Sequence, residues 1–114
     1  ENALDLQDAV ASIPAYVALS SLLLVLAPVC KHHETSRAAD YSTWRKRGWC
    51  RMELAAACLA PHDLPMMLVT GSEQVPYFIY ATDAICLPPG EGMFSCCAMN
   101  HVIGNTTIPC DKQR

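Results

Sequence analysis

Two uninterrupted apolar runs stand out in the pattern of hydrophobic and polar residues. One covers residues 22–26, between a pair of serines and Pro28, and the other covers residues 64–70 and stops at Gly71. Short apolar runs without polar alternation are typical of strands buried on both faces, as in a parallel sheet. Leucine also favours helices, but the short length of the first run and the proline after it favour a strand. We therefore predict strands at residues 21–27 and 64–70.

The segment between these runs contains the best helix pattern of the chain. Every residue from Gly48 to Ala60 is compatible with a helix, and Pro61 ends it. Apolar residues recur at helical spacing, and several alanines are small enough to let the helix lie close to a sheet. A strand, a helix at 48–60 and a second strand form a βαβ unit, for which a right-handed crossover is expected.

The residues before and inside this unit carry weaker patterns. Residues 1–11 predict a modest helix, and residues 12–19 predict a second short helix that Ser12 caps. Residues 29–43 are polar and irregular, and they predict a long loop.

The residues after the second strand are harder to assign. Residues 75–81 predict a strand or a short helix, and residues 83–87 predict one more short strand. From about residue 85 onwards we expect mostly loop. The chain therefore divides into an α/β domain at 1–84 and a Cys-rich extension at 85–114.

Composition limits the classes of function. The chain has 114 residues, enough for one core, with 52% hydrophobic and 17% charged residues and a net charge of −3. An average soluble domain has about 25% charged residues, so part of this surface is expected to face other protein subunits. The net charge argues against nucleic acid. No apolar run is long enough to span a bilayer, so we expect membrane association only through partners. The start at Glu1 rather than Met indicates a processed chain or a piece of a longer one.

Seven cysteines, an odd number, argue against a fully paired disulfide framework. Three of them, Cys30, Cys50 and Cys58, lie in apolar surroundings that are typical of core residues. The best metal candidates lie in the tail: Cys86, Cys96, Cys97, His101 and Cys110. The spacing lacks a C-x-x-C pair and adjacent cysteines rarely chelate together, so we expect free thiols and no metal. Zinc binding and a single disulfide are the alternatives.

A dense cationic run with both tryptophans precedes and opens the predicted helix. It comprises Trp44, Arg45, Lys46, Arg47, Trp49 and Arg51. Cations at a helix N-terminus are suited to binding an anion, and the same residues are suited to contacting a partner. Glu53 lies among them and is a candidate catalytic carboxylate. The alternative is a structural ion pair with one of the arginines.

These residues carry a family resemblance. Trp49-Cys50-x-x-Glu53-Leu54, preceded by an apolar strand that ends Leu26-Ala27-Pro28, resembles the middle of a TIR domain over about residues 12–70. The resemblance implies a flavodoxin-like α/β fold with a parallel sheet. The motifs RGWCRMEL, PPGEG-x-F-x-CC and IPCDK together resemble TIR-like proteins of single-celled algae. The chain departs from the family because no residues match the first TIR strand and its glycine-containing loop, so the expected fold is incomplete.

Two functions follow as expectations. The first is a non-catalytic interaction or structural module, an accessory subunit with no cofactor in a larger assembly. The algal resemblance implies an intracellular, organellar assembly, such as a photosynthetic complex of the plastid. The alternative is a TIR-type enzyme or signalling domain with NAD as its substrate. In NAD-hydrolysing TIR proteins the glutamate of the motif contacts the nicotinamide ribose, and by resemblance this residue is Glu53. A third hypothesis is a small zinc or thiol redox protein.

Overall fold

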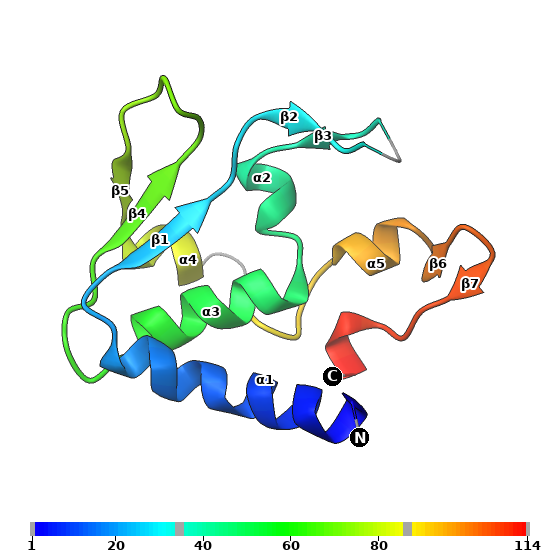
Figure 1. Ribbon diagram of the computed structural model, residues 1–114, viewed down its shortest axis with the longest axis horizontal. Helices are drawn as coiled ribbons and strands as arrows, with labels where there is room; N and C mark the ends of the chain where they lie inside the picture. The colour runs from blue at the N-terminus through cyan, green and yellow to red at the C-terminus, as the bar shows by residue number, and fades with distance from the viewer. Residues whose placement is uncertain (1, 34–35, 86–87, 114) are drawn as a thin grey trace.

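A small mixed sheet and a layer of helices form the centre of the molecule (Figure 1). The computed structural model describes residues 2–33, 36–85 and 88–113. Strand β1 (Leu23–Leu26) pairs in parallel with β4 (Met66–Val69), and β5 (Tyr77–Ile79) pairs antiparallel with β4. The α/β class and the two parallel strands are confirmed. The sheet is not wholly parallel, because the chain after Gly71 turns back directly instead of crossing over.

Helix α3 (Gly48–Cys58) connects the two parallel strands, as the apolar spacing and Pro61 predicted. Residues 2–19 form one helix, α1 (Asn2–Leu19), where two were predicted. Pro14 lies inside this helix and does not end it. Figure 1 shows α1 and α3 side by side on one side of the sheet.

The core lies between this helical layer and the facing side of the sheet. Leu54 and Ala57 of α3 pack with Val25 and Leu68 of the strands, and Val17 joins them from α1. Leu68 is completely buried. Ala57 is the buried alanine of α3 and is 4% exposed.

The connection from β1 to α3 is more ordered than the predicted loop. It contains an antiparallel pair, β2 (Cys30–Lys31) and β3 (Ala38–Ala39), followed by α2 (Tyr41–Trp44). Asp40 caps α2, since its carboxylate accepts a hydrogen bond from the Thr43 N–H while the Thr43 hydroxyl accepts one from the Asp40 N–H.

The C-terminal part also differs from the predicted loop. Helix α4 (Ala81–Ile85) takes the place of the start of the predicted strand at 83–87, of which residues 86–87 lie outside the described part. Then follow α5 (Ser95–Ala98), a hairpin of β6 (Val102–Ile103) and β7 (Thr106–Thr107), and the 3₁₀ helix η1 (Asp111–Gln113). We call residues 88–113 the C-terminal segment.

Candidate functional site

Arg51 is a buried cation that joins α3 to the C-terminal segment. Its side chain is only 3% exposed. The guanidinium donates three hydrogen bonds to backbone carbonyls, from Nε to Arg45 at 2.8 Å, from Nη1 to Glu91 at 2.6 Å and from Nη2 to Met93 at 2.8 Å. It also lies 4.1 Å from the centroid of the Phe94 ring. Arg51 therefore has a structural role within the fold, and its contact with an anion or a partner stays a prediction.

The other cations of the run do not converge on one point. Arg45 donates from Nη2 to the Asp83 carbonyl at 2.7 Å and lies 5.5 Å from the centre of the Tyr41 ring. Lys46 and Arg47 are exposed and make no side-chain hydrogen bond among the described residues. The four cations are adjacent in sequence but do not lie together in space. Arg45 and Arg51 bind backbone carbonyls within the fold, whereas Lys46 and Arg47 lie on the surface.

The N-terminus of α3 already has an anion. The Asp111 carboxylate accepts a hydrogen bond from the Gly48 N–H at 3.3 Å, at the position where an anion was one of the two expected ligands. The approach is close, because a Cβ added at Gly48 would lie 2.8 Å from the Asp111 Cβ. Sequence reasoning missed Asp111, since 63 residues separate it from the helix that it caps.

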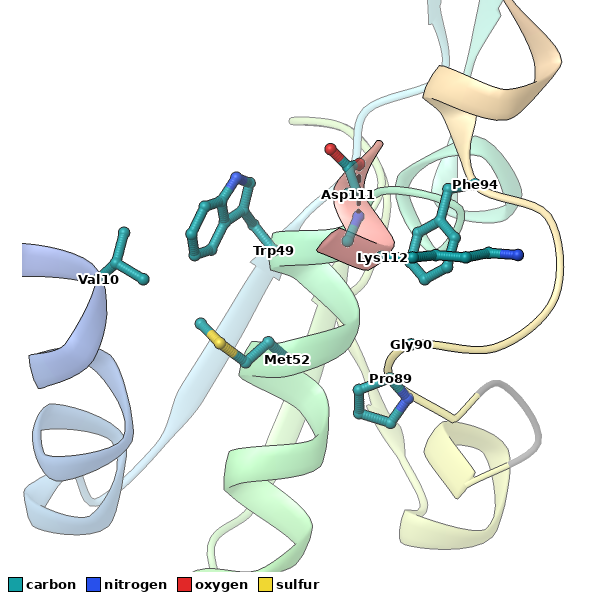
Figure 2. Close-up of a pocket in the computed structure, with 9 residues that line it drawn as sticks. Val10, Trp49, Met52, Pro89, Gly90, Phe94, Asp111 and Lys112 are labelled. Atoms are coloured by element: carbon teal, nitrogen blue, oxygen red, sulfur yellow. Dashed lines mark hydrogen bonds between the residues drawn. The ribbon is translucent and has the colours of Figure 1, made fainter. Parts of the chain in front are cut away.

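The two tryptophans have different surroundings. Trp44 stacks on Tyr41, with ring centroids 5.9 Å apart, and packs against the core. Trp49 lines a cavity of about 300 Å³, and Figure 2 shows the side chains of Trp49 and Met52 extending from α3 toward Val10 of α1. The polar side chains at this cavity come from η1, and one of them, Asp111, is already bonded to Gly48 (Figure 2). The cavity therefore offers few free polar groups to orient a ligand.

Glu53 is half-buried on α3. Burial raises the pKa of its carboxyl group above the ordinary value of 4.5, and the nearby Arg47 charge opposes that rise. Among the described residues no ion pair joins it to an arginine, so the structural alternative considered for Glu53 is not seen in that form. Glu53 lines neither the cavity beside Trp49 nor a second one of about 500 Å³ between α3, β4 and β5.

Four of the predicted metal candidates come together in the C-terminal segment: Cys96, Cys97, His101 and Cys110. Their ligand atoms all lie within 4.8 Å of one another, and the side chains are buried or half-buried. A hydrogen bond from the Phe94 backbone, aided by His101 and the neighbouring thiols, lowers the pKa of Cys97 to about 7. The fifth candidate, Cys86, lies outside the described residues. Cys50 and Cys58 lie elsewhere, and burial raises the pKa of both thiols. Cys30 was predicted as a core residue, but it is exposed on β2.

One face of the sheet has no cover in the described part of the chain. The strand register places five apolar side chains on this open face: Leu24, Leu26, Met67, Val69 and Phe78. Leu24, Leu26 and Phe78 are 51%, 66% and 57% exposed. The opposite face carries the buried core residues. The sequence predicted strands buried on both faces, and the structure covers only one.

Comparisons with protein-family models, curated proteins and solved structures gave no significant match. Over the ranges 2–33, 36–85 and 88–113, no helix is both long and apolar enough to cross a membrane.

Proposed function

We propose that this chain is a non-catalytic interaction module, an accessory subunit of TIR-like α/β type whose open sheet face is covered by another protein. The observation that carries the proposal is the open face itself. In the described part of the chain the parallel β1–β4 pair is covered on one face only, and a contiguous apolar patch on the other face is typical of a protein interaction surface. The strand–helix–strand order around Trp49–Leu54 supports the TIR-like part of the proposal.

The chemistry of the face favours an apolar protein surface as its occupant. Residues 21–30, 64–72 and 74–82 contain no Asp, Glu, Lys, Arg or His, so the strands and their flanks offer no charge to a charged ligand. Nucleic acid and anionic lipid headgroups need cations, which are absent from these three segments. Covering a half-exposed leucine or phenylalanine contributes about 1 kcal/mol, and the five side chains lie together in one patch.

The expected occupant is an amphipathic helix of a different polypeptide. Helices cover the faces of parallel strands because an apolar helical stripe fits the twisted sheet surface. A helix from the partner would pack against the open face of the sheet, as α3 packs against the opposite face. The outer edge of β1 also has no paired strand within the described residues, which extends the surface available to the partner.

Hydrolysis of NAD by Glu53 is less well supported. A catalytic carboxylate must lie where the substrate can reach it, and Glu53 lines neither the cavity beside Trp49 nor the one between α3, β4 and β5. The raised pKa of Glu53 is explained by the burial of its carboxyl group and does not require a catalytic role.

The test is isolation of the tagged full-length protein from its native cells, with its native mass and the stoichiometry of each partner measured. Leu26→Glu and Phe78→Glu place charges on the open face. Leu19→Glu and Leu59→Glu are matched controls, because these leucines are 85% and 83% exposed outside that face. We expect a partner at fixed stoichiometry that both open-face variants lose and both controls retain.

Three results would refute the proposal. The wild-type protein could run alone at its own mass, or it could form only a dimer of itself through this face. The partner could also be retained by the open-face variants. Cleavage of NAD by the wild-type protein that is lost in Glu53→Ala would support the enzyme instead.

A further inference from the structure

The Cys/His cluster of the C-terminal segment has the dimensions of a tetrahedral metal site. The Sγ atoms of Cys97 and Cys110 are 3.8 Å apart. Zinc–sulfur bonds of about 2.3 Å in a tetrahedron place two sulfur atoms ~3.8 Å apart, whereas a disulfide requires about 2.05 Å. All four ligand atoms fall within 4.8 Å, a span that one metal ion can bridge.

The local chain conformation brings these side chains together. Helix α5 supplies the two adjacent cysteines. Asn100 and His101 then both adopt positive φ, at 51° and 57°, which turns the chain back so that the His101 N–H donates to the Cys96 carbonyl at 2.8 Å. Such a conformation at two successive non-glycine residues costs about 1–3 kcal/mol each and persists only where the surroundings impose it.

The β6–β7 hairpin returns the last ligand. The Ile108 N–H donates to the His101 carbonyl at 2.8 Å and closes the hairpin. Gly104 at its tip has φ 60°, a conformation that glycine adopts without strain. Cys110 therefore arrives beside Cys97 although 13 residues separate the two.

Two further observations point to a ligand at this position. The Nε2 atom of His101 is buried and has no hydrogen-bond partner among the described residues. A buried ring nitrogen without a partner carries a desolvation cost that a metal ion would remove. The Asp111 N–H donates to the Cys96 Sγ at 3.4 Å, a contact that stabilises a thiolate and orients it.

We infer that Cys96, Cys97, His101 and Cys110 bind one Zn²⁺ ion as a Cys₃His site. Binding displaces one proton from each thiol to solvent, and the neutral imidazole contributes a lone pair. The three thiolates and the dication leave the site with one net negative charge. Soft sulfur ligands with one imidazole select zinc over magnesium or calcium, which prefer oxygen. Four protein ligands close the coordination shell, which is typical of a structural site.

The bound ion would connect α5 to the residue just before η1. Asp111 follows the ligand Cys110 directly and caps α3 through its carboxylate. The metal therefore fixes the position from which Asp111 reaches Gly48. A chain with a limited core gains stability from such a cross-link.

The test measures how much zinc stays bound to the reduced full-length protein after it has been incubated with Zn²⁺ and the unbound Zn²⁺ has been removed. Elemental analysis and Co²⁺ substitution give the stoichiometry and the thiolate-to-cobalt absorption. We expect one zinc per chain, lost in Cys110→Ser and His101→Ala with an affinity decrease of more than about 100-fold. Cys30→Ser and His62→Ala are matched controls, because both side chains are exposed and lie outside the cluster.

A conservative variant separates ligand loss from misfolding. Cys110→His supplies another zinc ligand and is expected to retain the metal, whereas Cys110→Ser loses it. The inference is overturned if the reduced wild-type protein binds no zinc. It is overturned equally if zinc stays bound in the ligand variants, or if Cys97 and Cys110 form a disulfide in native protein isolated with free thiols blocked.

Discussion

Replacing Arg51 by alanine removes the guanidinium that joins α3 to the C-terminal segment. A hydrogen bond to a charged group contributes about 1.5–3 kcal/mol, and the structure has three of them. The contact with the Phe94 ring adds about 1 kcal/mol. Two terms reduce the sum. The desolvation cost of a buried cation disappears, and water can reach the carbonyls of the exposed residues Glu91 and Met93. We expect a net loss of about 3 kcal/mol.

Urea unfolding measures this loss directly. For a domain of this size, 3 kcal/mol corresponds to a fall in Tm of roughly 10 °C. Arg51→Met retains much of the packing but makes no hydrogen bond, and Arg51→Lys retains the charge but not the planar fork. Both are expected to lose at least half as much free energy of unfolding as Arg51→Ala. Hydrogen exchange adds a local readout, since the Ser95 N–H donates to the Lys46 carbonyl and should lose protection first.

Arg37→Ala is the control, because Arg37 is exposed and its side chain makes no hydrogen bond in the described part of the structure. It should change stability by less than about 0.5 kcal/mol. If Arg51→Met unfolds at the same urea concentration as the wild-type protein, the three carbonyl contacts do not hold the segment and the reasoning fails.

Two other residues give predictions of opposite sign. Gly48→Ala places a methyl group against the Asp111 Cβ and should lower the free energy of unfolding by about 1–3 kcal/mol. Urea unfolding measures this change, and an unchanged midpoint would show that η1 moves aside freely. Glu53→Gln should raise stability at pH 7 and change it little near pH 4. The raised pKa of Glu53 means that its protonated form suits the fold, so the stability it contributes is present below pH 4.5 and is lost as pH rises through the raised pKa. Unfolding at both pH values checks this, and a less stable variant at pH 7 would indicate an ion pair with Arg47.

The sequence was sufficient to predict the helices and strands whose pattern lies within their own residues. Strands β1 and β4 contain no polar residue, and α3 ends at Cys58, two residues before the end predicted from Pro61. The TIR-like resemblance depends on the same residues and remains a prediction. A separate helix was predicted from Ser12 because serine caps helices, yet the preceding residues are helical and α1 continues through Pro14.

The parts of the site that depend on distant residues had no local signal. Arg51 lies in the cationic run, but its partners Glu91 and Met93 are 40 and 42 residues away. The charge of Arg51 was visible in the sequence, but the direction of its side chain was not. The cysteines were visible as candidates, but adjacency argued against them because the turn at His101 and the hairpin that returns Cys110 were unknown. The lack of cover on one sheet face cannot be inferred from apolar runs, which look the same with or without a partner.

The outer edge of β1, which pairs with no strand in the described part of the chain, has a consequence for the fate of the newly made chain. Residues 22–26 form an apolar, uncharged edge with no lysine or proline inside it to block pairing. If a partner covers the sheet as proposed, this edge is open before binding to the same segment of another copy, and self-association rises with concentration. A chain of this kind is expected to survive only while its partner is made in matching amounts. Its abundance in the cell should therefore follow that of the partner rather than the level of its own message.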